Sequence, residues 1–276
     1  MVSAWLAGLL ALASPVAAAM PEPPAGPPYT LPRSVERVVH APDGEAYRLF
    51  VAWPEAPPPP SGYPVLYVLD GEDNFAIAAL TARRLAGAGA RSGVGEGIVV
   101  GIAAGSLQRR ARDYTPATPG WTIPATMPGS GWPTGGAEAF LDLVERQVQP
   151  FVRQHWRVDR SRETLLGHSF GGLLALHAAL TRPAMFGGVV AVSPSLWFGN
   201  GLIAREAATA GASHPRILIA EGDAAAAPPA ELARSLDRGG GADHARFLPL
   251  PGQTHGTTML AAMAPAIRFA FARAAP

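Results

Sequence analysis

The feature that most constrains the fold of this chain is the pentapeptide GHSFG at residues 167–171. The apolar segment before it, residues 163–167, is typical of a buried strand, and residues 171–180, rich in leucine and alanine, are typical of a helix. Glycines beside a serine fit a strained turn from a strand into a helix, where larger side chains would clash. Such a turn raises the Ser169 hydroxyl above the sheet edge, near a helix N-terminus whose dipole favours negative charge. We therefore predict that Ser169 is a nucleophile.

Strand-like and helix-like segments alternate along much of the remaining chain. This alternation predicts a single three-layer α/β domain with a mostly parallel central sheet covered by helices on both faces. The first two strands are expected to form an antiparallel hairpin at the N-terminal edge of that sheet. The order of elements is that of the α/β-hydrolase fold. Strands are expected at residues 34–40, 47–53, 64–70, 97–102, 163–169, 187–193, 216–220 and 246–250, and helices at about 75–88, 137–155, 171–180 and 258–273.

The N-terminus has the pattern of an export signal. Residues 4–19 form an uncharged apolar run that ends in Ala17-Ala18-Ala19, a typical cleavage site, although no Lys or Arg precedes the run. The alternative is a transmembrane anchor, which the short length of the run and Pro15 within it disfavour. We predict a signal peptide at 1–19, an extended proline-rich arm at 20–33 and the α/β-hydrolase catalytic domain at 34–276. The mature protein is then periplasmic or secreted, with no stable membrane association expected.

Composition excludes several classes of function. The 276 residues include no cysteine, which excludes disulfides, thiolate metal sites and cysteine nucleophiles. The formal net charge is +1, so nothing favours nucleic acid as a partner.

A serine nucleophile in this fold needs a histidine base, which follows the acid in chain order. His255 lies in the glycine-containing loop after the last expected strand, where this fold presents its base. His214 and His244 each precede a strand and therefore lie at the other end of the sheet. His168 flanks the serine and is expected to pack in the turn. We predict His255 as the base.

Two carboxylates compete for the role of the acid that orients this histidine. The expected strand at 216–220 is followed by Glu221-Gly222-Asp223. A carboxylate at this point can hold the imidazole and stabilise its cationic form. Asp223 is preferred because it lies further beyond the strand, and Glu221 is the alternative.

An oxyanion hole is expected from two backbone N–H groups. The first belongs to Phe170, the residue after the nucleophile. The second belongs to the sharp turn Asp70-Gly71-Glu72 after the strand at 64–70. We assign the N–H of Glu72, with that of Gly71 as a near alternative.

These motifs resemble the putative-esterase family of α/β hydrolases, and most closely its periplasmic trilactone esterases that act on enterobactin, salmochelin and bacillibactin siderophores. The resemblance implies ester hydrolysis through an acyl-enzyme, with no metal and no cofactor. In some of these esterases the acid is thought to be weak or absent, so the acid here is either a full member of the triad or a bystander. The matching segments are VLYVLDG (65–71), RARDYTPA (110–117), GGAEAF (135–140), DRSRETLLGHSFGGLLAL (159–176) and SPSLW (193–197).

The resemblance also implies a substrate, a macrocyclic serine trilactone that carries catecholates and forms an anionic iron complex. Residues 103–136 are expected to form a long loop rich in glycine and proline, and such loops are usually functional. Arg109, Arg110 and Arg112 in this segment could bind the anionic complex. An alternative is that Arg110 pairs with Asp113 to hold the loop. Aromatic side chains could stack on rings of the ligand, and the candidates are Trp197, Trp121 and Trp132.

Three other functions stay open. The enzyme could hydrolyse a different ester, such as an acylated sugar, a feruloyl ester or a xenobiotic. It could transfer the acyl group to the alcohol of a sugar or lipid in place of water. A remote alternative is a non-catalytic protein that binds ferric siderophores.

Overall fold

The computed structural model describes residues 26–27, 29–211, 214–223, 227–237 and 244–273. The predicted signal peptide, residues 1–19, lies outside the described residues. The chain divides into a unit that ends at Leu31 and a unit from Pro32 to Pro276, and every described helix and strand belongs to the second unit. Among these described helices, none has the length and apolar character that a bilayer-spanning segment requires.

The second unit is built around one eight-stranded sheet in the order β1-β2-β4-β3-β5-β6-β7-β8. β2 pairs with β1 and β4 in the antiparallel sense, and all other neighbours are parallel, as the sequence predicts. β3, β4 and β6 are buried along their whole length, as expected for strands covered on both faces. The strands are β1 (Ser34–His40), β2 (Ala46–Ala52), β3 (Tyr63–Leu69), β4 (Ile98–Ile102), β5 (Val158–His168), β6 (Gly188–Val192), β7 (Arg216–Gly222) and β8 (Ala245–Leu250).

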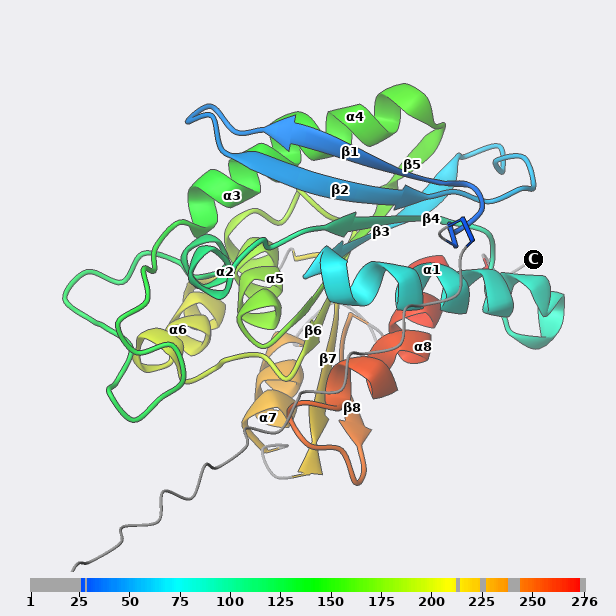
Figure 1. The fold of residues 1–276 in the computed structure, drawn as a ribbon. Coiled ribbons are helices and arrows are strands. Elements are labelled where there is room, and N and C mark those ends of the chain that lie inside the picture. Colours follow the sequence, from blue (N-terminus) through cyan, green and yellow to red (C-terminus); the bar gives the residue numbers. More distant parts are fainter. Residues whose placement is uncertain (1–25, 28, 212–213, 224–226, 238–243, 274–276) are drawn as a thin grey trace, which may run out of the picture. The chain divides into compact units, whose positions relative to one another are not determined.

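Helices form a layer on each face of this sheet (Figure 1). α1 and α8 pack against each other on one face, and α2, α3, α5, α6 and α7 follow one another on the other face. Because the parallel strands all point the same way, their carboxyl ends and the helices that follow them meet at one edge of the sheet. The helices are α1 (Gly71–Gly87), α2 (Leu107–Tyr114), α3 (Ala137–Leu143), α4 (Gln149–His155), α5 (Phe170–Thr181), α6 (Leu202–Thr209), α7 (Ala227–Leu236) and α8 (Thr258–Phe271).

The prediction that residues 103–136 form one long loop is wrong over part of this range, because α2 lies within it. The Ser106 side chain caps this helix by accepting a hydrogen bond from the backbone N–H of Arg109 at 3.2 Å. α2 is short and rich in arginine, so it lacks the apolar repeat by which a helix is recognised in a sequence. Residues 115–136, after α2, contain no helix or strand, as expected.

The expected helix at 137–155 is present, but it is interrupted. α3 and α4 are joined by a single π-helical turn at Val144–Val148. Pro150 lies in the first turn of α4 and has no N–H to donate to the preceding turn. A π turn at this point accommodates the missing hydrogen bond.

Candidate active site

Ser169 lies on a strained turn between β5 and α5. Its backbone has φ 58° and ψ −114°, a region that L-residues rarely occupy, at a cost of about 1–3 kcal/mol. The turn is held by the Ser169 N–H, which donates to Val192 O at 2.9 Å. A Cβ at Gly167 would lie 2.2 Å from the carbonyl oxygen of Gly171, so only glycine fits at that position. The pentapeptide therefore adopts the turn that its sequence predicts.

A second strained turn lies beside the first. Asp70 has φ 53° and links the end of β3 to the first residue of α1, Gly71. A Cβ at Gly71 would lie 2.7 Å from the backbone nitrogen of Ile102, so this turn also requires glycine. The first N–H groups of a helix have no carbonyl partner within it, and both Glu72 and Phe170 are at such positions. The oxyanion-hole assignment of these two N–H groups stays a prediction.

The Glu72 side chain binds the backbone of the segment between β4 and α2. Its two carboxylate oxygens accept hydrogen bonds from the backbone N–H groups of Ala104 at 3.0 Å and Gly105 at 2.7 Å. These residues follow β4 and precede α2, so Glu72 fixes the path of the chain at the edge of the site.

His255 lies in the loop between β8 and α8, and its backbone carbonyl is held on two sides. His168 Nε2 donates to this carbonyl at 2.8 Å, and the Thr258 hydroxyl donates to it at 3.0 Å. The rings of His168 and His255 are 4.7 Å apart between centroids. Within the described part of the chain, no hydrogen bond joins the His255 ring to Ser169 Oγ. The role of His255 as base stays a prediction.

Both candidate acids lie at the end of β7, and each has other partners. Glu221 is buried, and its Oε1 accepts hydrogen bonds from Ser193 Oγ at 2.7 Å and from the Gly222 N–H at 2.9 Å. Asp223 is exposed, and its Oδ2 accepts from the N–H of Gly252 at 2.7 Å, in the loop that leads to His255. Among the described contacts, neither carboxylate reaches the His255 ring, so the choice between them stays open.

Sequence reasoning missed Ser195, which lies beside the nucleophile. Its hydroxyl is 3.3 Å from Ser169 Oγ, and its N–H donates to Ser169 O at 3.2 Å. Ser195 belongs to the SPSLW segment that follows β6, the neighbour of β5 in the sheet. Neighbouring parallel strands end at the same edge of the sheet. Ser195 could therefore have been identified in the sequence as a polar residue directly after the strand next to β5.

The arginines of α2 divide into two groups. Arg110 binds the carboxylate of Asp70 through Nε at 2.6 Å and Nη2 at 2.9 Å, and Nη2 also donates to His168 O at 2.8 Å. The predicted alternative, a pair between Arg110 and Asp113, is therefore wrong. Asp113 instead accepts hydrogen bonds from Tyr47 and Arg112.

Arg109 and Arg112 contact residues at the start of β2. Arg112 binds both carboxylate oxygens of Glu45, and Arg109 Nε is 3.4 Å from the same carboxylate. The Arg109 guanidinium also lies 3.7 Å above the Tyr47 ring. Residues three apart share a helix face. If α2 had been predicted as a helix, Arg109 and Arg112 would have been placed on one face and Arg110 on another. Their predicted binding of substrate stays untested, but they are not in the lining of the cavity at Ser169.

That cavity has a volume of about 690 Å³. Its charged side chains are three carboxylates, of Asp70, Glu72 and Asp73, and one guanidinium, of Arg110, which Asp70 already binds. Three of its lining residues are exposed hydrophobic side chains, and they accompany the exposed carboxylates of Glu72 and Asp73. The hydrophobic residues are Ile77, Leu107 and Leu260, which are 38%, 61% and 57% exposed.

Trp197 packs near Phe170, the residue after the nucleophile. It is half-exposed, and its ring centroid is 5.9 Å from that of Phe170 and 6.3 Å from that of Trp121. Phe198 packs edge-on against Trp121 and Phe170 in the same cluster. An aromatic surface therefore adjoins Ser169, and its use in substrate binding stays a prediction.

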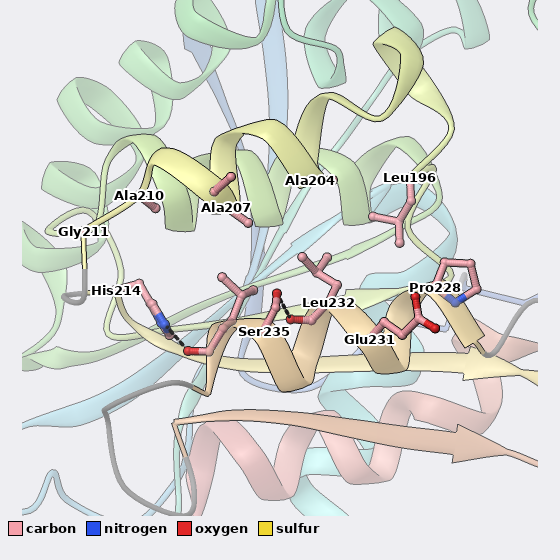
Figure 2. A pocket seen from close by; sticks show the side chains of 12 residues that line it. Leu196, Ala204, Ala207, Ala210, Gly211, His214, Pro228, Glu231, Leu232 and Ser235 are labelled. Atoms are coloured by element: carbon pink, nitrogen blue, oxygen red, sulfur yellow. Dashed lines mark hydrogen bonds between the residues drawn. The ribbon is translucent and has the colours of Figure 1, made fainter.

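A second cavity of about 680 Å³ lies between α6 and α7 (Figure 2). Its lining is mostly alanine and leucine side chains, with His214 at one end. The ring nitrogens of His214 contact the carbonyl oxygens of Pro215 and Leu236, both at 2.9 Å. The lining of this second cavity includes none of the predicted catalytic residues, so the cavity at Ser169 is the candidate active site.

In the described part of the chain, no group of three His, Asp or Glu side chains is placed to hold a metal ion.

Comparison with known proteins identifies the family. Residues 42–237 match the protein family described as "Putative esterase". The chain belongs to this family. Ferri-bacillibactin esterase BesA from Bacillus subtilis is 32% identical over 184 residues, which are 64% of this chain and 64% of that protein. The siderophore triacetylfusarinine C esterase from Aspergillus fumigatus is 38% identical over 189 residues, 65% of this chain and 62% of that protein. The matched region thus spans just under two thirds of each of these relatives.

The fold of this esterase-family chain also matches solved structures. The BES protein from Bacillus cereus superimposes with a TM-score of 0.79 at 25% identity, covering 90% of this chain and 99% of that one. The predicted α/β-hydrolase fold, with its mostly parallel sheet and antiparallel edge, is confirmed.

Proposed function

We propose that this chain is a serine esterase that hydrolyses the ester bonds of a siderophore through an acyl-enzyme on Ser169. The observation that carries the proposal is the position of Ser169. Ser169 is in the lining of a cavity of about 690 Å³ and lies on one of two strained turns that each begin a helix. Membership of the esterase family and the named substrates of the relatives support ester hydrolysis of siderophores.

In the proposed reaction, Ser169 Oγ attacks the carbonyl carbon of the ester while His255 takes the serine proton. The carbonyl oxygen becomes negatively charged and is bound by the backbone N–H groups of Phe170 and Glu72. The bond to the alcohol oxygen then breaks, and His255 gives its proton to the leaving alcohol. Water, deprotonated by His255, attacks the acyl-enzyme and releases the acid and free Ser169.

His255 has to turn its ring toward Ser169 for this chemistry. Its side chain is exposed, so the ring can rotate about its side-chain torsions without displacing the core. Its backbone, in contrast, is fixed by His168 and Thr258. Hydrogen bonds between catalytic groups are often long or absent before substrate binds, so this arrangement is compatible with a base.

The cavity suits a bulky ester. Its volume lies within the range of ~300–1,000 Å³ that is usual for small-molecule sites. The exposed apolar side chains in its lining, Ile77, Leu107 and Leu260, can contact the arms of a macrocycle whose ester bond reaches Ser169. The relatives are named for bacillibactin, triacetylfusarinine C and enterobactin, so the proposal covers cyclic siderophore esters as a class.

Further parts of the proposal concern the acid and the location. We take Asp223 as the acid, because it binds the loop that carries His255. We also propose export to the periplasm or the medium, on the basis of the signal peptide predicted at residues 1–19.

Product analysis by liquid chromatography and mass spectrometry tests the function. The protein is incubated with iron-free and ferric enterobactin, with triacetylfusarinine C and with p-nitrophenyl butyrate, each beside the Ser169→Ala variant. We expect linear siderophore products from the wild type and none from the variant. Cleavage of p-nitrophenyl butyrate but of no siderophore would support a serine esterase and contradict the siderophore substrate. Sugar and feruloyl esters would then be tested. Siderophore binding without turnover would indicate a binding protein.

A further inference from the structure

Arg110 connects the two strained turns of the site. Its guanidinium binds both carboxylate oxygens of Asp70, at 2.6 and 2.9 Å, and also the carbonyl oxygen of His168, at 2.8 Å. Asp70 is the residue before Gly71 and Glu72, and His168 is the residue before Ser169. One side chain therefore spans the gap between the turn that begins α1 and the turn that begins α5.

This connection is largely shielded from water. The side chains of Arg110 and Asp70 are 16% and 13% exposed. The guanidinium lies 5.3 Å from the ring centroid of Tyr114 and 6.0 Å from that of Phe170. The Tyr114 hydroxyl also accepts a hydrogen bond from the Asp70 N–H at 3.2 Å, so Asp70 is held through its backbone as well as its carboxylate.

We propose that Arg110 is a positioning residue that fixes the distance between the two backbone N–H groups of the oxyanion hole. This inference rests on the proposed function, and it replaces the direct contact with substrate that the sequence suggested for this arginine. The N–H groups of Glu72 and Phe170 belong to different helices, and the pairing of β3 with β5 ends at Val68 and Leu166, before either helix begins. Arg110 supplies a link between the two turns.

The chemistry of the side chain explains why arginine is needed. A guanidinium has five N–H donors in a rigid plane, and three of them are used in these contacts. A lysine ammonium is a single point and cannot bind both Asp70 oxygens and the His168 carbonyl in the same geometry. Arg110→Lys is therefore expected to keep the charge and to lose most of the alignment.

Misalignment of the oxyanion hole acts on the transition state. Loss of one oxyanion-hole donor lowers kcat by about 10²–10³-fold in other serine hydrolases. We expect Arg110→Gln to lower kcat by about 10²-fold and Arg110→Lys by about 10-fold, with KM for a small neutral ester changed by less than about 3-fold. A small neutral ester such as p-nitrophenyl butyrate has no charge for an arginine to bind.

Asp70→Asn separates positioning from direct binding of substrate. This variant weakens the bidentate pair and releases the Arg110 cation into the cavity. If Arg110 positions the turns, kcat falls for neutral and anionic esters alike. If Arg110 only binds the substrate, kcat for a neutral ester such as p-nitrophenyl butyrate keeps its wild-type value in Asp70→Asn, and that result would overturn the proposal.

Arg153→Gln is the matched control for loss of a buried ion pair. Arg153 on α4 binds both carboxylate oxygens of Glu163 at 2.8 Å, and Glu163 is completely buried, so this variant removes a comparable pair distant from Ser169. We expect it to lower the unfolding temperature and to leave kcat unchanged.

The experiment measures kcat and KM for p-nitrophenyl butyrate, the unfolding temperature, and the rate at which an organophosphate phosphorylates Ser169. Positioning by Arg110 predicts slower phosphorylation in Arg110→Gln, because the phosphoryl oxygen has to enter the oxyanion hole. Unchanged kcat and phosphorylation in Arg110→Gln would refute it, as would equal kcat losses in Arg110→Gln and Arg153→Gln. A wild type that cleaves p-nitrophenyl butyrate but no siderophore refutes only the substrate assignment. A wild type without any turnover refutes the esterase and, with it, the role of Arg110.

Discussion

His168 donates a hydrogen bond from Nε2 to the backbone carbonyl of His255 at 2.8 Å. The residue before the nucleophile thus holds the loop that carries the proposed base, and β5 and the β8–α8 loop become one unit. This contact requires a neutral His168 with its proton on Nε2 or a doubly protonated ring, since a carbonyl oxygen can only accept.

The pKa of His168 gives a prediction for acid stability. Burial lowers the pKa of His168 to about 4, the charges of His255 and Arg110 act in the same direction, and the hydrogen bond to the His255 carbonyl partly opposes them. Between about pH 4 and pH 6.5 the unfolded chain binds a proton at His168 that the folded chain does not, so the free energy of unfolding falls as the pH falls through this window. The loss is ~3 kcal/mol at most, because one pKa unit corresponds to about 1.4 kcal/mol.

Urea unfolding at pH 7, 5.5 and 4.5 checks this expectation. His168→Gln should lose less stability than the wild type between the first and last pH. His40→Gln, at an exposed position on β1, serves as the control and should follow the wild type. An identical pH dependence in His168→Gln and wild type would contradict the assignment of the proton to His168.

Gly167→Ala is expected to destabilise the fold. The added Cβ would lie 2.2 Å from the backbone oxygen of Gly171, and backbone at that position cannot move without distorting the turn. We expect a loss of about 1–3 kcal/mol or more in the free energy of unfolding together with loss of activity. The control is Gly87→Ala at the end of α1, where a Cβ meets nothing within 4 Å and helix propensity favours alanine. Comparable urea midpoints for the two variants would refute the steric argument.

The charges of the cavity predict a preference among substrates. Carboxylates outnumber the guanidinium in its lining, and Arg110 is neutralised by Asp70, so neutral esters should be favoured over anionic ones. Asp73 is exposed in this lining, and Asp73→Asn should raise kcat/KM for an anionic p-nitrophenyl ester several-fold relative to a neutral one. By the same argument, iron-free siderophore should be cleaved faster than its anionic ferric complex.

The ratio of kcat/KM for the two esters is measured at 10 mM and 500 mM salt. The effect of Asp73→Asn should shrink at high salt, because the Debye length falls from about 30 Å to a few Å. Glu55→Gln removes an exposed charge that is not in the lining of the cavity and should leave the ratio unchanged. If the ratio of kcat/KM is the same in wild type and Asp73→Asn and at both salt concentrations, charge does not determine the substrate preference.

Two substitutions distinguish the candidate acids. Asp223 is exposed and binds one N–H of the β8–α8 loop, whereas Glu221 is buried and binds Ser193 and Gly222. We expect Asp223→Asn to lower kcat by at least 10²-fold with an almost unchanged unfolding temperature. Glu221→Gln should mainly lower the unfolding temperature. The reverse pattern, measured by kinetics and thermal unfolding, would make Glu221 the acid.

Features of the fold that depend on residues adjacent in the sequence could be predicted. The turn at Ser169 needs only the glycines beside it, a strand before it and a helix after it. The buried strands β3, β4 and β6 are continuous apolar runs, so their place inside a parallel sheet was also visible.

Contacts between distant segments could not be predicted in this way. Arg110 and Asp70 are 40 positions apart, and Asp113, three residues after Arg110, was the more obvious partner in the sequence. Ser195 approaches Ser169 only because β5 and β6 are neighbours in the sheet. Such contacts follow from strand order and helix rotation, which local patterns do not encode.

The exposed apolar side chains in the cavity lining also affect how this protein should be handled. Ile77, Leu107 and Leu260 present exposed hydrocarbon in the lining of the cavity that also contains Ser169. Detergent monomers and other amphiphiles bind such surfaces by the hydrophobic effect, at a gain of about 0.8 kcal/mol per buried methylene. Surfactants added to assays therefore compete with the substrate at this site, and the apparent KM rises with the length of their alkyl chain.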